Sequence, residues 1–175
     1  MGVEAIRSST PTAVRAAIKE TLNLILNKTE TDVQEFIASF RAKFDQLPFE
    51  EIARNSSLGE LDDYETSDGS FMKSTPIHVK GAIVYNDLLE KLKLKGKYAP
   101  IYRKDKIKFC YLRVPNPTFV NVISVPGTLP PQFELDKYID RHLQFEKTYL
   151  EPIRKIMDKI GWELEKRTKL SSFFG

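Results

Sequence analysis

The chain has 175 residues, of which 41% are hydrophobic and 29% are charged, so it is long enough for one domain with a buried core. Cys110 is the only cysteine, and His78 and His142 are the only histidines, which excludes a disulfide framework and argues against a zinc or iron centre. No apolar run is long enough to span a bilayer and the first residues lack a signal-peptide pattern, so we expect an intracellular protein without a membrane partner.

The first part of the chain predicts two helices packed as an antiparallel hairpin. Thr10 as N-cap and Pro11 at the first helical position start the first helix, whose apolar residues keep helical spacing to about residue 27. Thr31 and Gln34 can form a capping box at the start of the second, which Pro48 closes. The apolar stripe of the second helix, expected to be core, is Val33, Phe36, Ile37, Phe40 and Phe44.

The middle of the chain predicts one helix and two strands. Residues 54–75 are rich in glycine, serine and aspartate and are expected to be irregular. Residues 76–92 carry apolar side chains by threes and fours, which predicts a helix, although Gly81 is unfavourable inside it. The segments 107–114 and 118–125 alternate with period two, and P-N-P between them predicts a turn.

A last helix is predicted over about residues 135–160. Pro152 should kink or divide it, because the proline ring removes a backbone donor and clashes one turn back. Gly161 should end it as a C-cap. All these elements together predict an α+β fold, mostly helical with a small antiparallel sheet.

Charge is unevenly distributed along the chain. The net charge is +3, yet residues 1–70 carry 7 basic and 13 acidic side chains, a net of −6. Residues 91–113 carry 9 basic side chains against Asp105 alone, a net of +8, with tyrosines and a phenylalanine between them. Such a run is typical either of a solvated surface or of one that binds a polyanion such as nucleic acid.

No pattern of catalytic residues is present. The sequence lacks a glycine-rich phosphate loop, G-x-S-x-G, H-E-x-x-H and a D-x-D pair, so no independent enzyme is predicted. Cys110 lies in a strand pattern, where a small buried hydrophobe is expected. His78 has two interpretations, a packing or capping residue or a donor to phosphate. Ser8 and Ser9 precede the first helix and either cap it or present amides to a phosphate.

Three separated stretches carry a resemblance to a known family. They are G-V-E-A-I-R-S-S-T-P-T-A-V-R at residues 2–15, T-P-I-H-V-K-G-A-I-V-Y-N at 75–86 and L-S-S-F-F-G at 170–175. In this order and spacing they resemble the start of the thumb, a later thumb helix and the clamp-binding tail of family B DNA polymerases, those of T-even-like phages in particular. The resemblance implies a polymerase thumb over residues 1–162 and, over 163–175, a tail that holds a sliding-clamp-binding peptide.

The resemblance covers practically the whole chain, and it leaves out the catalytic parts of such a polymerase. The exonuclease, palm and fingers, with their metal-binding aspartates, have no counterpart, and Met1 falls where the thumb begins. We therefore expect either a naturally split polymerase subunit or a fragment of a longer chain, non-catalytic by itself. No cofactor is expected in this chain, and the Mg²⁺ of the complete polymerase is implied for the other domains.

In that family the thumb holds the duplex behind the active site through backbone phosphates, independently of sequence. Asn121 stands where a lysine is common, and Glu151 stands where a second lysine tends to follow Lys147 by one turn. The basic run at 91–108 would compensate for these departures. The resemblance implies contact with phosphates or the minor groove by Arg54, Asn55, Ser56, Lys73, His78, Lys80, Asn121 and Lys147.

The chain ends on a small apolar cluster of Leu170, Phe173 and Phe174. The residues alone allow two interpretations, a tail that plugs the chain's own core or a peptide ligand for a partner's groove. The resemblance favours the ligand, with these three side chains in a hydrophobic groove of the sliding clamp. Ser172 replaces an aromatic residue of relatives, which should lower the affinity.

The expected partners are primer–template duplex DNA, the sliding clamp and the remaining polymerase domains, on the same or a separate chain, in the cytoplasm of a phage-infected bacterium. Two other classes stay open. One is an independent DNA- or RNA-binding protein with a C-terminal peptide hook. The other is a protein–protein adaptor whose basic run binds an acidic partner.

Overall fold

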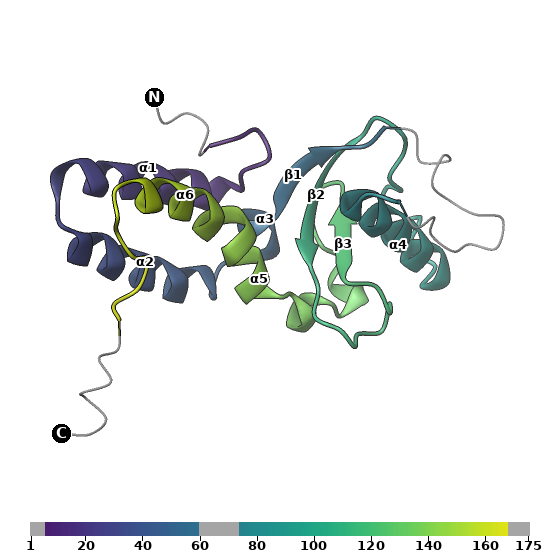
Figure 1. Cartoon of the computed structure of the whole chain (residues 1–175). Helices are drawn as coiled ribbons and strands as arrows, with labels where there is room; N and C mark the ends of the chain where they lie inside the picture. The colour runs from purple at the N-terminus through teal and green to yellow at the C-terminus, as the bar shows by residue number, and fades with distance from the viewer. Residues whose placement is uncertain (1–5, 60–73, 168–175) are drawn as a thin grey trace, which may run out of the picture.

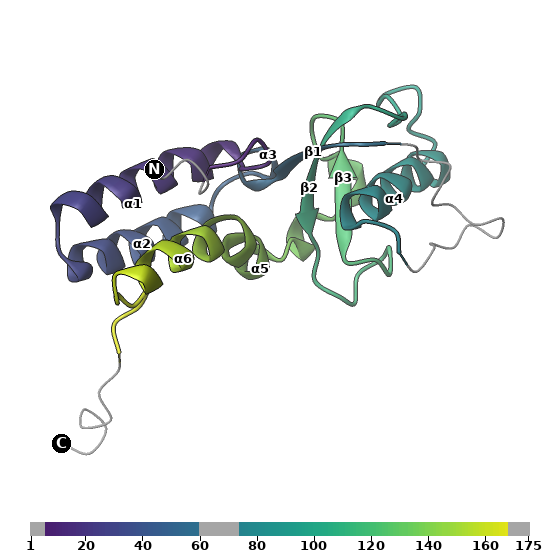
Figure 2. The ribbon, with the colours of Figure 1, turned by 45° about the horizontal axis from the view of Figure 1, so that its top comes forward.

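The computed structural model describes residues 6–59 and 74–167. The molecule is elongated and consists of two lobes, one at each end of its long axis (Figures 1 and 2). The lobe at one end is helical and the lobe at the other end is a sheet covered by a helix. The helical lobe contains α1 (Thr12–Asn27), α2 (Glu30–Phe44), α5 (Arg141–Phe145), a π-helical turn η4 (Glu146–Leu150) and α6 (Glu151–Lys159). The sheet lobe contains β1 (Arg54–Ser57), α4 (Ile77–Lys91), β2 (Lys106–Tyr111) and β3 (Val122–Val125), and a short helix α3 (Phe49–Ile52) leads into it.

The helix α2 begins two residues earlier than its expected capping box. Thr29 is the N-cap: its hydroxyl accepts from the backbone amide of Asp32 at 3.3 Å, and the Asp32 carboxylate accepts from the Thr29 amide at 3.1 Å. The prediction of a Thr31–Gln34 box is therefore wrong, because an aspartate three residues after Thr29 closes the same motif earlier. Gln34 is buried and donates instead to the carbonyl oxygen of Glu163 at 2.9 Å.

Aromatic rings fill the helical lobe, as the spacing of α2 predicted. Phe40 lies 4.9 Å from Tyr149 and Phe44 lies 5.2 Å from Phe145, both as edge-to-face pairs between ring centroids. The Tyr149 hydroxyl lies 2.6 Å from that of Thr21 in α1. Burial raises the pKa of Tyr149 to about 12, so this hydroxyl stays protonated in the core.

The last helix is shorter than predicted and is divided. Residues 131–133 and 136–138 form 3₁₀ turns (η2, Pro131–Phe133, and η3, Asp136–Tyr138), and α5 starts only where the Asp140 carboxylate accepts from the Leu143 amide at 3.0 Å. The start at 135 is therefore wrong, because Leu135 and Ile139 are buried in an irregular segment, where Ile139 bridges to Leu112.

The two predicted breaks in this helix are confirmed. The π-helical turn η4 separates α5 from α6 directly before Pro152, which stands in the first turn of α6. Gly161 follows the helix with φ of +73°, and the Trp162 amide donates to the Met157 carbonyl at 3.0 Å. This is the glycine C-cap that the sequence predicted.

The sheet has the order β1-β2-β3, and both pairs are antiparallel. The two strands predicted from period two are confirmed as β2 and β3, although they are shorter, and a loop at 112–121 joins them. The prediction that residues 54–57 are irregular is wrong, since they form the edge strand β1, held by main-chain pairing with β2. The α+β fold class is confirmed.

Helix α4 lies so close to β3 that Gly81 is required at their contact. The hydroxyl of Ser124 donates to the carbonyl oxygen of His78 at 2.7 Å. A Cβ atom on Gly81 would lie 2.3 Å from the Ser124 hydroxyl and 2.6 Å from its backbone nitrogen. The glycine that weakened the helix prediction is therefore explained by the close approach of helix and strand.

Replacing Gly81 with alanine should destabilise the protein by about 1–3 kcal/mol, as for overpacked cores, because the added methyl group meets strand backbone. Helix propensity alone predicts the opposite, a gain of about 1 kcal/mol. The Tm should fall by about 2–4 °C for each kcal/mol in a chain of this size. Gly96→Ala is the matched control, since a Cβ there has nothing within 4 Å. A Gly81→Ala protein that melts at or above the wild-type Tm would contradict the packing described.

Candidate nucleic-acid interface

One face of the sheet gathers two of the predicted DNA-binding residues around Phe109. Arg54 lies opposite Phe109 in the β1–β2 register, so both side chains project from the same face. The Arg54 guanidinium carbon is 6.0 Å from the centre of the Phe109 ring, and the His78 ring is 6.2 Å from it. Arg54 and His78 therefore flank one aromatic ring although 24 positions separate them in the sequence.

The neighbouring residues of β1 divide between the two faces of the sheet. Ser56 is two residues after Arg54 and shares its face. Asn55 projects the other way, and its groups are engaged by the segment before α1: its backbone amide donates to the Ser9 carbonyl at 3.0 Å and its Nδ2 to the Thr10 carbonyl at 3.4 Å. Asn55 thus attaches the N-terminal segment to the edge of the sheet.

The segment before α1 is a tight turn over residues 7–10. The Thr10 amide donates to the Arg7 carbonyl at 3.0 Å, and the Thr10 hydroxyl accepts from the Arg7 amide at 2.9 Å. Thr10 therefore closes this turn and does not cap α1, which begins at Thr12 after Pro11. The prediction of Thr10 as N-cap and Pro11 as first helical residue is one position too early: Pro11 is the N-cap, and the Thr10 hydroxyl binds the Arg7 amide.

Arg15 holds this turn from inside α1. Its guanidinium donates to the carbonyl oxygens of Arg7, Ser8 and Thr10, at 3.1, 3.0 and 3.1 Å. All three acceptors are neutral, so they orient the guanidinium without cancelling its charge. The Arg15 guanidinium therefore places a positive charge directly beside the main chain of Ser8. Arg15 could not be identified from the sequence, since contacts with main-chain carbonyls leave no residue-type pattern.

Three arginines belong to these segments: Arg7 to the turn, Arg15 to α1 and Arg54 to β1. Among the ion pairs between described residues, none includes Arg7, Arg15 or Arg54. Burial lowers the pKa of His78, so its imidazole is neutral at neutral pH and offers a hydrogen bond, not a charge. We give the name arginine face to two adjoining parts: the 7–10 turn with Arg15 at the β1 edge of the sheet, and Arg54, Ser56 and His78 around the buried Phe109 ring.

Other predicted contact residues lie elsewhere. Lys80 is two residues beyond His78 on α4, about 200° around the helix, so it projects away from Phe109. Lys147 is in η4 of the helical lobe, 3.1 Å from the Glu151 carboxylate, so a local partner offsets its charge. Asn121 is exposed in the loop before β3. Lys73, Leu170, Phe173 and Phe174 lie outside the described residues.

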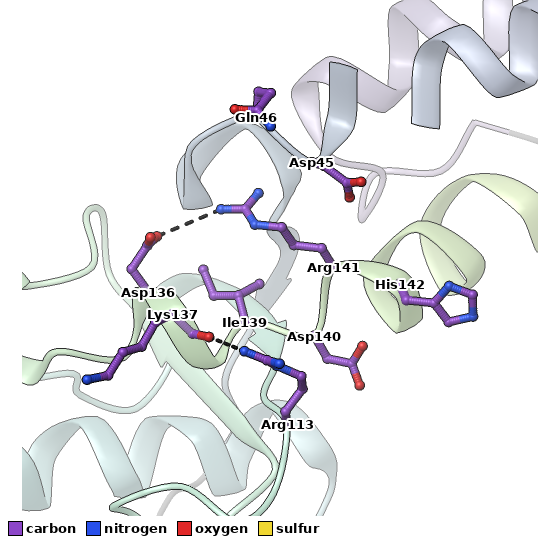
Figure 3. A pocket seen from close by; sticks show the side chains of 9 residues that line it. All are labelled: Asp45, Gln46, Arg113, Asp136, Lys137, Ile139, Asp140, Arg141 and His142. Carbon is purple, nitrogen blue, oxygen red and sulfur yellow. Dashed lines mark hydrogen bonds and ion pairs between the residues drawn. The ribbon is translucent and has the colours of Figure 1, made fainter. Parts of the chain in front are cut away.

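A pocket of about 570 Å³ lies between the lobes, and its two arginines are engaged by other residues that line or adjoin it (Figure 3). Arg141 donates to the Leu47 carbonyl at 2.6 Å and lies 3.8 Å from the Asp136 carboxylate. Arg113 donates to the carbonyl of Lys137. Both acidic and basic side chains line the pocket, and its arginines already have partners, which favours a structural junction over a site for a charged ligand.

The described part of the chain contains neither a candidate metal site nor a reactive cysteine. Residues 6–59 and 74–167 contain no group of three histidine, cysteine or acidic residues that could hold a metal ion. Cys110 is fully buried, as predicted, and burial raises the pKa of its thiol well above its ordinary value, so it is unreactive. No helix in these ranges is long and apolar enough to cross a membrane.

Comparison with known proteins relates the chain to one segment of phage DNA-directed DNA polymerases. It is 30% identical to the enzyme of Enterobacteria phage T4, over an alignment that covers 100% of this chain and 19% of the relative. It is also 30% identical to that of Escherichia phage RB69, with 99% of this chain and 19% of the relative covered. The chain thus spans about a fifth of the length of the curated relatives it matches. No protein-family model matches it.

The lowered pKa of His78 predicts a pH dependence of stability. An unfolded histidine titrates near pH 6.5, and the native imidazole binds its proton less readily, so the unfolded state binds more protons as pH falls through that value. His78 should therefore cost stability below about pH 6.5. Differential scanning calorimetry at pH 7.5 and 5.5 measures the effect: the fall in Tm between the two pH values should be smaller for His78→Gln than for the wild type. Equal losses in the two proteins would show that the His78 environment is not as described.

Proposed function

We propose that the chain is the thumb and clamp-tethering part of a family B phage DNA polymerase, holding primer–template duplex through sequence-independent backbone contacts. Its similarity along its whole length to a segment of phage DNA-directed DNA polymerases carries the proposal. Nucleotide transfer with Mg²⁺ would belong to the remaining polymerase domains, on the same or a separate chain. The proposed setting is the cytoplasm of an infected bacterium.

The arginine face suits a duplex backbone better than a specific sequence. A guanidinium can bind phosphate oxygens through two parallel hydrogen bonds, and Arg54 is the candidate for this contact. Arg15 has its Nε and Nη2 groups engaged by main-chain carbonyls, so it would offer a phosphate its Nη1 group and its charge. Ser56 adds a hydroxyl on the same side of β1. Arginine and hydroxyl contacts to phosphates position a duplex without reading its bases.

Arg54→Ala should weaken duplex binding several-fold on every sequence and reduce the slope of log affinity against log salt by about 0.9, the contribution of one phosphate contact. Fluorescence anisotropy with two unrelated blunt duplexes across a salt series measures both quantities. Lys147→Ala should have a smaller effect, because Glu151 already pairs with that lysine. Lys155→Ala, at an exposed position of α6, is the control for loss of a distant charge.

Two results would contradict this assignment. One is an unchanged affinity and salt slope in Arg54→Ala. The other is a loss on one duplex sequence only, which would indicate base recognition in place of backbone contact.

The tail would leave the molecule beside α2. The segment after α6 runs along that helix: the Glu163 amide donates to the Glu30 carboxylate at 3.1 Å, and Arg41 lies 2.9 Å from the Glu165 carboxylate. In Figure 1 the described chain ends on this side of the helical lobe. A clamp-binding peptide at residues 169–175 would thus begin next to a helix that is part of the folded core.

Deleting residues 169–175 should abolish binding to a T-even-type sliding clamp while leaving the Tm nearly unchanged, because a peptide ligand holds no core. Phe173→Ala and Phe174→Ala should each weaken binding, and Ser171→Ala is the matched control. Surface plasmon resonance on immobilised clamp and a thermal melt make the two measurements. If the tail instead plugs the core, each phenylalanine is worth about 2–3 kcal/mol and the deletion lowers the Tm by several degrees. Unchanged clamp affinity after the deletion would refute the tether.

A further inference from the structure

The turn at residues 102–105, at the end of the β1–β2 pair, presents an exposed tyrosine among basic side chains. Tyr102 is 63% exposed, and Lys104 and Lys106 follow it. We propose that this turn binds single-stranded nucleic acid, with an unpaired base stacked on the Tyr102 ring and the flanking phosphates neutralised by the two lysines. An aromatic platform beside cationic side chains is the common means of binding single strands without sequence preference.

The backbone that carries Tyr102 is fixed before any ligand arrives. The preceding residue, Ile101, is buried, and the Asn86 side chain of α4 binds its main chain twice, from Nδ2 to the Ile101 carbonyl at 2.9 Å and from the Ile101 amide to Oδ1 at 2.8 Å. The Asp105 carboxylate accepts from the Tyr102 amide at 2.8 Å. A stacked base would therefore meet a ring on an ordered turn, which lowers the entropy cost of binding.

The same contacts make the turn an extension of the sheet. The Leu58 amide donates to the Asp105 carbonyl at 3.0 Å, and the Lys104 amide to the Gly59 carbonyl at 3.4 Å. These bonds continue the β1–β2 pairing beyond Lys106. Lys104 has φ of +65°, a conformation that a lysine rarely adopts and that here belongs to the tight turn.

The charge around Tyr102 also favours a polyanion. Asp105 is the only acidic residue between positions 91 and 113, and its carboxylate is turned to the Tyr102 amide. Farther back in this basic run, Lys91 and Lys95 pair with Asp87 and Glu90. Lys104 and Lys106 are exposed, and no described carboxylate forms an ion pair with either. Lys93 and Lys97 are also exposed and outside the ion pairs between described residues, but only Lys104 and Lys106 follow the exposed ring within the same turn.

A second exposed aromatic residue shows why the ring alone is insufficient. Phe119 is 89% exposed, in the loop at 112–121. The one basic residue of that loop, Arg113, donates to the Lys137 carbonyl. Phe119 therefore lacks neighbouring lysines and provides a matched control. Stacking also explains why the ligand is single-stranded, since bases inside a duplex already stack on one another.

The experiment uses the full chain and fluorescein-labelled oligodeoxythymidine, with a blunt duplex as the second probe. Tyr102→Ala should weaken binding to the single strand by about tenfold, within the range found when a stacking side chain is truncated. Tyr102→Phe keeps the ring and should stay within about twofold of the wild type. Phe119→Ala should change nothing, and none of the three should alter duplex binding.

A spectroscopic readout tests the stacking itself. Trp162 is the only tryptophan, so Tyr102→Trp combined with Trp162→Phe places a single indole in the turn. Its fluorescence should be quenched by the oligonucleotide, and Lys104→Ala with Lys106→Ala should shift the quenching curve to higher oligonucleotide concentration. The double change Lys91→Ala with Lys95→Ala, at paired lysines, should shift it less.

The proposal is overturned if the wild-type chain does not bind the single strand, if Tyr102→Ala binds it as the wild type does, or if the indole is not quenched. It is equally overturned if Tyr102→Ala weakens single-strand and duplex binding alike. This inference does not rest on the polymerase role. Failure of the duplex assay with Arg54→Ala would contradict the proposed function and leave the Tyr102 result to be judged separately.

Discussion

The side-chain amide of Gln144 joins the two lobes, and the position of the arginine face depends on it. Gln144 belongs to α5 and is fully buried. Its Nε2 donates to the Ile52 carbonyl at 2.8 Å and to the Phe109 carbonyl at 3.4 Å, while its Oε1 accepts from the Tyr111 amide at 3.1 Å. Each buried main-chain group left without this partner would cost about 1–3 kcal/mol, so the amide fixes β2 and the end of α3 against the helical lobe.

The arginine face is built on this fixed frame from segments far apart in the chain. β2 supplies the Phe109 ring, β1 supplies Arg54 and α4 supplies His78. Asn55 then holds the turn before α1 at the sheet edge, and Arg15 holds the same turn from α1. The guanidinium groups are placed by neutral carbonyls and an aromatic ring, so their charge remains available to an anion.

The elements with strong periodicity could be predicted from the sequence, and those held by distant partners could not. The first helix, α4, β2 and β3 follow apolar spacing directly. Strand β1 has no apolar alternation, since Arg54–Ser57 pairs only through its main chain with a strand fifty residues later. At the start of α2 both Thr29 and Thr31 fit the capping pattern, and local sequence cannot choose between them. The resemblance to a polymerase family predicted Arg54 and His78 as contact residues. Arg15 could be identified only from its hydrogen bonds to the folded turn.

Amide NMR of the 20.1 kDa chain during titration with a short blunt duplex tests the central claim most directly, because it locates the bound DNA residue by residue. The account predicts that the largest shifts at low salt fall on the amides of Ser8 and Ser9, on Arg54–Ser57 and around His78, and that they fade as salt rises. Shifts concentrated in α5–α6 around Lys147, with the arginine face unchanged, would contradict it.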